Sequence, residues 1–361
     1  MKLRRVEMLI AACFHYSGLL KLVRWWTEKS GQRLVILNYH CAAGGDYYHT
    51  MGGDLRRHLL YLRRHYRLLH LETALEELYA PQNNGPGRRE RRTPLVLTFD
   101  DGYRDNYTHA LALVRELHVP ITVFLVPGYI ESGRRFWWME GDQLVAHAQV
   151  KEVSIGEHTY HLGRPDERKA LAQVIDTHLR YATSVTEREE FLDSVRGLLA
   201  EPSLVTAEEK ASLPLTWAEV QEMKKSGWVS FGAHTMRHPV LAYLTNPAEI
   251  QYEVSESRIV LEQQLGNPVY AFAYPIGQPE HIGKTAICAV QEAGYSWAVT
   301  TIDGLNTPQT DPYFLHRYVV DVGQHWLTVA AKASGVWGFF TRICRMPVTL
   351  IRMLSQRALQ S

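Results

Sequence analysis

Residues 94–103, PLVLTFDDGY, form an apolar run that ends in two adjacent carboxylates, Asp100 and Asp101. Such near-continuous apolar character is typical of a strand buried on both faces of a parallel sheet. Similar short runs at 34–40, 121–127, 229–234, 269–275 and 296–301 alternate with helix-period segments at 53–66, 110–118, 216–227, 246–266 and 283–294. This alternation predicts an α/β protein whose parallel sheet is either open or closed into a barrel.

Polar side chains follow four of the predicted strands. The carboxyl ends of parallel strands share one edge, so we expect these groups to converge there. Adjacent carboxylates could supply a metal ligand and a separate base, although Asp-Gly is also a common turn dipeptide. His234 and His238, four residues apart, would share one face of a helix and, with one carboxylate, complete a metal site. The other two strands end in Asn38-Tyr39-His40 and Tyr274-Pro275-Ile276-Gly277.

The composition is that of an ordinary folded protein, with 361 residues, 46% of them hydrophobic, and a formal net charge of +1. The charge is segregated: residues 1–33 carry +5, residues 324–361 carry +5, and the segment between them carries −9. An acidic body is a poor partner for nucleic acid, whose binding requires clustered Lys and Arg. The basic, apolar ends instead favour peripheral contact with a membrane surface, or packing of both ends on the barrel.

The N-terminal run MLIAACFHYSGLL has the charged start of a signal peptide, but His15 interrupts it and no clear cleavage site follows. It is also too short to span a bilayer. We therefore expect a helix over 1–33 and a basic amphipathic tail over 324–361, kinked at Pro347. The four cysteines show no CxxC spacing and favour a reduced compartment, so the predicted location is cytoplasmic, at the inner face of a membrane.

Two motifs resemble the NodB-homology polysaccharide deacetylases of carbohydrate esterase family 4. TFDDGY is similar to the family's T-F-D-D-G, and HTMRH at 234–238 is similar to its H-S/T-x-x-H. The resemblance covers roughly residues 34–320. It implies a deformed (β/α) barrel that removes N-acetyl groups from amino sugars. The implied cofactor is a zinc-type divalent ion, held by Asp101, His234 and His238, with Asp100 as the base.

The sequence departs from the commonest family pattern at the third motif. The family's R-P-P-Y-G is replaced by Tyr274-Pro275-Ile276-Gly277, whose Tyr274 and Pro275 are expected to line the substrate pocket. An arginine that tethers the base must come from elsewhere, and Arg317 is the candidate. A solvated charge is the alternative for Arg317.

The general acid is assigned through a second resemblance. Tyr39-His40 and YPIG match a branch that resembles poly-N-acetylglucosamine deacetylases, which makes His40 the expected acid and His316 the second choice. The backbone N–H near Tyr103 is expected to join the oxyanion hole. All four motif positions are intact, which argues against the competing function, a sugar-binding pseudoenzyme without turnover.

About 130 residues separate the two metal motifs, far more than one helix–strand unit needs. We therefore expect a helical insertion over about 136–215, near the active face. It begins with Phe136-Trp137-Trp138, which could stack on sugar rings or pack beneath the insertion. The glycan itself is left open by the sequence: a polysaccharide, an oligosaccharide or a lipid-linked sugar would each fit.

Overall fold

The computed structural model describes residues 2–29, 32–41, 55–81, 92–199 and 210–337. Most of the glycine- and proline-rich linker that the sequence predicts at 81–94 lies outside these ranges, as do Pro347 and the rest of the tail from residue 338.

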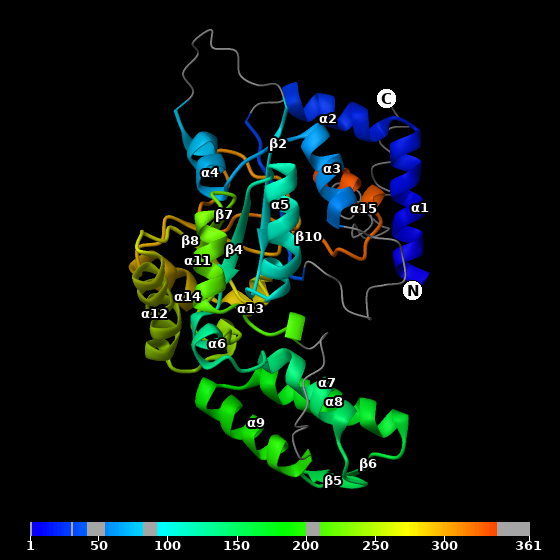
Figure 1. Ribbon diagram of the computed structural model, residues 1–361, viewed down its shortest axis with the longest axis vertical. Coiled ribbons are helices and arrows are strands. Elements are labelled where there is room, and N and C mark those ends of the chain that lie inside the picture. Colours follow the sequence, from blue (N-terminus) through cyan, green and yellow to red (C-terminus); the bar gives the residue numbers. More distant parts are fainter. Residues whose placement is uncertain (1, 30–31, 42–54, 82–91, 200–209, 338–361) are drawn as a thin grey trace, which may run out of the picture.

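A curled parallel sheet forms the centre of the protein (Figure 1). Its strand order is β10-β1-β3-β4-β7-β8-β9, and β2 pairs with β3. The bounds are β1 Val35–Tyr39, β2 Arg67–Leu68, β3 Pro94–Phe99, β4 Ile121–Leu125, β7 Val229–Ala233, β8 Ala271–Ala273, β9 Trp297–Val299 and β10 Tyr318–Val319. These strands coincide with the predicted apolar runs, apart from the short β2 and β10.

The segment before β10 brings the two edges of the sheet together. Leu315 N–H donates to Ala298 O at 3.0 Å, Thr300 N–H donates to Leu315 O at 2.8 Å, and β10 then pairs with β1. The curled sheet is the deformed (β/α) barrel that the motifs imply, and this prediction is confirmed.

Helices surround the sheet, and several of them lie where the 3.6-residue period predicts them. α11 (Trp217–Lys225) begins at a capping box formed by Thr216 and Glu219. α12 (Pro247–Leu265) begins at the Asn246 cap and ends at Gly266. The others are α3 Leu55–His65, α4 Leu71–Tyr79, α5 Leu111–Leu117 after a π-turn at Asn106–Ala110, α6 Pro127–Ser132, a 3-10 turn at Leu241–Tyr243, α13 Pro279–Ile282 and α14 Lys284–Glu292. Of these helices, α3, α5, α11, α12 and α14 lie at the predicted segments, whereas α4, α6 and α13 were not predicted.

The insertion forms a separate layer at one end of the molecule (Figure 1). It contains α7 (Trp137–His147), α8 (Pro165–Tyr181) and α9 (Val185–Leu199), whose apolar side chains form one cluster with Tyr103, Val126 and Tyr129 of the barrel. An antiparallel hairpin of β5 (Glu152–Ile155) and β6 (His158–His161) connects α7 to α8. The described residues between 136 and 199 are largely helical, and they include a hairpin that the sequence analysis did not predict.

The N-terminal helices and the last described residues of the chain meet on one flank. α1 (Lys2–Tyr16), α2 (Leu19–Lys29) and α15 (Trp326–Ala333) share a cluster in which Ala11 and Leu20 pack with Leu327 and Trp337. Residues 326–337 thus pack on the body, the alternative that the charge pattern left open.

In the part of the chain described, no single helix is long and apolar enough to cross a bilayer. Among the described helices, only α1 from Arg5 onward and α2, taken together and bent by 70°, meet that length and composition.

Candidate active site

A cavity of about 470 Å³ lies at the carboxyl ends of the strands. Five residues that the sequence singles out line it together: His40 after β1, Asp100 and Asp101 after β3, and His234 and His238 after β7. The insertion closes one side with Trp137, Trp138 and Arg180. The shared edge of the parallel sheet therefore brings these distant segments to one place.

Asp101, His234 and His238 form a compact set of ligand atoms. Nε2 of each histidine lies 3.5 Å from Asp101 Oδ1. Zinc binds N and O ligands at about 2.0–2.2 Å in a tetrahedron, and this sets the ligand–ligand separation at about 3.4 Å. Asp101 Oδ1 is buried and makes no hydrogen bond. An orphaned carboxylate oxygen facing two imidazoles fits a divalent cation as the missing partner.

A hydrogen bond orients the His234 imidazole for this role. His234 Nδ1–H donates to Ala273 O at 2.7 Å, which directs Nε2 toward the site. Burial, and then repulsion from His234, lowers the pKa of His238 to about 3, which favours the neutral imidazole. Burial also favours the neutral form of His234, but the carboxylates of Asp101 and Asp100 outweigh it and raise the pKa of His234. A bound cation would take the place of that proton.

Asp100 lies beside this set and is held by an ion pair. Arg317 NH1 and NH2 donate to its two carboxylate oxygens, each at 2.7 Å, and Asn38 Nδ2 donates at 2.8 Å. Arg317 is fully buried and also donates to Thr300 O at 2.7 Å. Burial opposes ionisation of Asp100, but the Arg317 guanidinium outweighs it and holds the pKa of this carboxyl well below its usual range. Arg317 therefore holds Asp100 as a tethering arginine would, and it is not a solvated charge.

The two candidate acids have different surroundings. The His40 side chain is half-buried and lines the cavity, and Asn106 Nδ2 donates to its backbone carbonyl at 3.1 Å. His316 is not among the cavity-lining side chains of the described chain; it packs against Gly304, where an added Cβ would lie 2.5 Å from His316 Nδ1.

The three residues expected to bind the substrate do not share one location. Tyr103 lines the cavity, and its hydroxyl accepts a hydrogen bond from Trp138 Nε1 at 2.7 Å. Tyr274 is instead fully buried in the core, where its hydroxyl donates to Tyr313 O at 3.1 Å. Pro275 is also buried, and in the described chain neither residue lines the cavity. The chain turns beyond the end of β8, where Ile276 has φ of 61° and Gly277 has φ of 73°, and Ile276 and Gln278 line the cavity in their place.

The aromatic residues at the start of the insertion have different roles: some pack in the apolar cluster and some line the cavity. Phe136 and Trp137 are at most 1% exposed and belong to the apolar cluster beneath the insertion, although Trp137 also contributes to the cavity lining. Trp138 is half-buried, lines the cavity, and its ring lies 4.3 Å from that of His238. Trp138 is thus the member of the run that has an open surface for a sugar ring.

Comparison with known proteins identifies the class. The polysaccharide deacetylase family matches residues 87–196 and 198–298. The chain belongs to this family: it is a hydrolase that acts on N-acetyl amide bonds of an acetylated glycan.

Individual relatives are distant. YxkH of Bacillus subtilis (strain 168) is 22% identical over 300 residues, which are 83% of this chain and 75% of YxkH. Streptococcus pyogenes deacetylase PplD, solved in complex with acetate, has a TM-score of 0.54 at 17% identity and covers 84% of this chain and 99% of its own. IcaB from Ammonifex degensii also has a TM-score of 0.54, at 19% identity, and covers 84% and 98%. At this identity the structures support the fold.

Proposed function

We propose that the protein is a metal-dependent deacetylase that removes acetyl groups from amino sugars of a polysaccharide, an oligosaccharide or a lipid-linked glycan. The observation that carries the proposal is the juxtaposition, in one cavity, of an orphaned three-ligand set with an aspartate whose charge is held by a buried arginine. The donor set of two imidazoles and one carboxylate is the one that catalytic zinc uses.

A cation held by Asp101, His234 and His238 would polarise the acetyl carbonyl and lower the pKa of a bound water. Asp100 is ionised at neutral pH and accepts the proton of that water. Arg317 and Asn38 fix both oxygens of Asp100, so the carboxylate does not have to reorient during the reaction.

His40 protonates the departing sugar amine, which is otherwise too basic to leave. Its support is its position: it lies on the cavity wall, whereas His316 does not. The backbone N–H near Tyr103 is our candidate for the oxyanion hole. Trp138 and Arg180 lie on the insertion side of the same cavity and are available to the sugar.

The test measures acetate release from chitin oligomers, peptidoglycan fragments, an exopolysaccharide and lipid-linked N-acetylglucosamine, after chelation and again after adding zinc. We expect turnover of at least one substrate to vanish with chelator and to return with zinc. Sugar binding without acetate release in both states would favour the pseudoenzyme. Acetate release that survives complete metal removal would contradict metal dependence.

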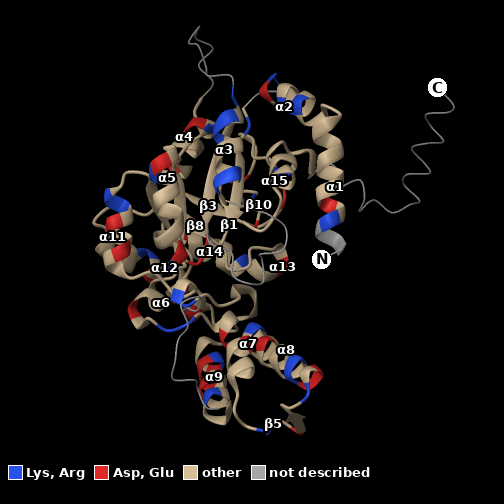
Figure 2. Cartoon of the chain, turned by 45° about the vertical axis from the view of Figure 1, so that its right-hand side comes forward, with Lys and Arg blue, Asp and Glu red and all other residues tan. Residues whose placement is uncertain are grey.

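We also propose peripheral contact with an anionic membrane, through the outward faces of α1 and α2. Both helices are mostly uncharged along their length (Figure 2). Large apolar side chains between 50% and 59% exposed lie on them, namely Val6, Leu9, Leu22, Trp25 and Trp26. Apolar side chains this exposed, gathered on two consecutive helices, indicate a surface that contacts a partner.

The flanking charges support a lipid surface as that partner. The Lys29 ammonium lies 4.2 Å from the Trp25 ring, and the Arg33 guanidinium lies 4.9 Å from the Trp26 ring. Tryptophan flanked by cations is the composition of helices that lie in the headgroup region of anionic bilayers. The location at the inner face of a membrane stays a prediction.

Co-sedimentation with vesicles tests this contact. Full-length protein should sediment with phosphatidylserine-containing vesicles and much less with phosphatidylcholine alone. The triple variant Leu22→Ser/Trp25→Ser/Trp26→Ser should remain in solution. The matched control Tyr252→Ser/Ile259→Ser removes two similarly exposed apolar side chains from α12 and should sediment like the wild type. Equal sedimentation of the triple variant would refute the contact, as would concentration-dependent dimerisation that the triple variant abolishes without any lipid binding.

A further inference from the structure

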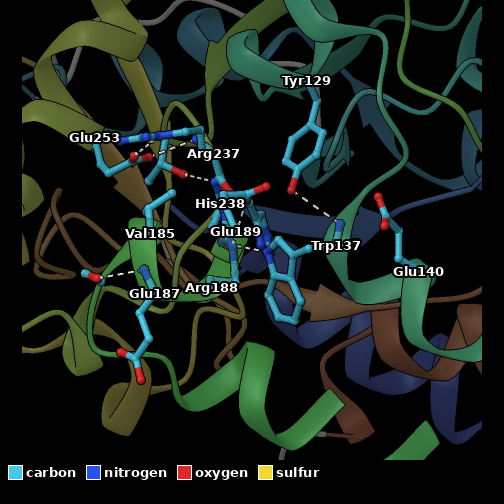
Figure 3. A network of polar contacts seen from close by, with 12 residues as sticks. Tyr129, Trp137, Glu140, Val185, Glu187, Arg188, Glu189, Arg237, His238 and Glu253 are labelled. Atoms are coloured by element: carbon cyan, nitrogen blue, oxygen red, sulfur yellow. Dashed lines mark hydrogen bonds and ion pairs between the residues drawn. The ribbon is translucent and has the colours of Figure 1, made fainter. Parts of the chain in front are cut away.

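Two helices of the insertion reach the loop that carries His234 and His238 (Figure 3). From α9, Arg188 donates to Arg237 O at 3.0 Å and to His238 O at 3.4 Å. From α7, Trp137 Nε1–H donates to His238 O at 2.9 Å. The backbone carbonyl of a candidate metal ligand therefore receives two donors from a part of the chain that supplies no ligand of its own.

Arg188 is only 2% exposed, although it carries a full charge. Burying a guanidinium is unfavourable unless its donors find acceptors. Its carboxylate partner is the neighbouring Glu189, at 3.0 Å, and its guanidinium also lies 5.4 Å from the Trp137 ring. The remaining donors point at the loop carbonyls, so the burial of this charge is coupled to the conformation of the loop.

The loop needs such restraint because its backbone is strained. Thr235 has φ of 64° and His238 has φ of 55°, the left-handed region that non-glycine residues rarely adopt. On the opposite side, the buried Glu253 accepts from Arg237 N–H and from Arg237 Nε, both at 2.8 Å. Thus α12 holds a donor of the loop, while the insertion holds its carbonyls.

We propose that Arg188 and Trp137 are positioning residues that pre-organise His238 for metal binding. This inference rests on the proposed metal-dependent function and extends it to the insertion, which thereby acts as part of the metal site and not only as a wall of the substrate cavity. Loss of a partner that orients a ligand typically lowers metal affinity 10- to 100-fold.

Zinc affinity, measured by competition with a chromophoric chelator, is the primary readout. Trp137→Phe keeps an aromatic ring but removes the N–H, and Arg188→Gln removes the charge and most of the donors. We expect each to weaken zinc binding about 10-fold or more. The absorption of the cobalt-substituted protein should change as well, because it reports the geometry around His238.

Arg196→Gln is the matched control. Arg196 lies on the same helix and pairs with the buried Glu140 at 2.6 Å and with Asp193, all within the insertion. This variant should lower the thermal midpoint of the metal-free protein while zinc affinity stays at the wild-type value. If Arg188→Gln does not fold, Trp137→Phe decides alone.

The outcomes separate this inference from the proposed function. Wild-type protein that binds no zinc would refute the metal-dependent function itself. Wild-type protein that binds zinc, with Trp137→Phe and any folded Arg188→Gln binding it equally well, would overturn only the positioning role.

Discussion

Replacing Arg317 with methionine should lower the free energy of unfolding at pH 7 by about 3–5 kcal/mol, the usual effect of breaking a buried ion pair on one side. The burial and geometry of the Asp100–Arg317 pair favour a loss of free energy near the upper end of this range. Asp100 and Arg317 are at most 2% exposed, and both bonds between them are 2.7 Å long. The substitution also removes the donor to Thr300 O and leaves Asn38 as the donor that holds Asp100.

The loss should depend on pH in a defined direction. In the wild type the pKa of Asp100 is depressed, so its stabilisation is present above the ordinary carboxyl pKa of 3.8 and is lost as pH falls through the lower, folded-state value. Without Arg317, burial raises the pKa of Asp100, and the penalty then grows as pH rises above about 4. The difference between the two proteins should therefore be largest near neutrality and shrink toward pH 4.

Urea denaturation with chelator present, at several pH values between 4 and 7.5, measures this difference. Arg56→Met is the matched control: it breaks a similar two-bond pair with Glu116, but on the surface, and should change stability little. Adding Asp100→Asn to Arg317→Met should restore part of the stability, since no buried charge is then left unpaired. Destabilisation no larger than that of Arg56→Met, or a loss unchanged down to pH 4, would refute the reasoning.

Other predictions concern the chemistry. Asp101→Ala and His238→Ala should each abolish binding of about one divalent ion per chain in equilibrium dialysis followed by elemental analysis; full zinc content in both would remove the ligand assignment. Asp100→Asn should retain the ion but lose about 10²- to 10⁴-fold in kcat, and a wild-type rate would reduce Asp100 to a structural role. His40→Ala should slow amide substrates far more than aryl acetate esters, whose phenolate leaves unaided. The same asymmetry in His316→Ala, with His40→Ala unaffected, would reverse the choice of acid.

The strands and their terminal residues could be predicted because they depend on local patterns. Continuous apolar runs identify strands buried on both faces, and parallel pairing then brings their carboxyl ends to one edge. The contact of Asn38 with Asp100 could not be predicted from local patterns, because it depends on the register in which Asn38 lies opposite Thr98. That register is set by the packing of the whole sheet.

The insertion was harder to interpret for a physical reason. A charged residue on an amphipathic helix is usually solvated, and nothing local distinguishes the buried Arg188 from its exposed neighbours. The hairpin of β5 and β6 did leave a signal, namely an apolar–polar alternation around Gly156, whose φ is 62°. Tyr274 was misplaced because a motif gives the order of residues, whereas the side that each one faces here is set by a turn with positive φ at Ile276 and Gly277.

Holding the loop of His234 and His238 from two sides has a consequence for the proposed role of the insertion. The barrel alone delivers His234 directly from the end of β7, with its ring bonded to Ala273 O in the adjacent strand. His238 lies four residues further on, beyond a backbone in the left-handed region, and its carbonyl is bonded to the insertion. One histidine is thus fixed by the sheet and the other by α7 and α9. A shift of the insertion, whether by substitution or by a bound glycan, would therefore act on the metal site through His238 first, while Asp101 and His234 kept their positions.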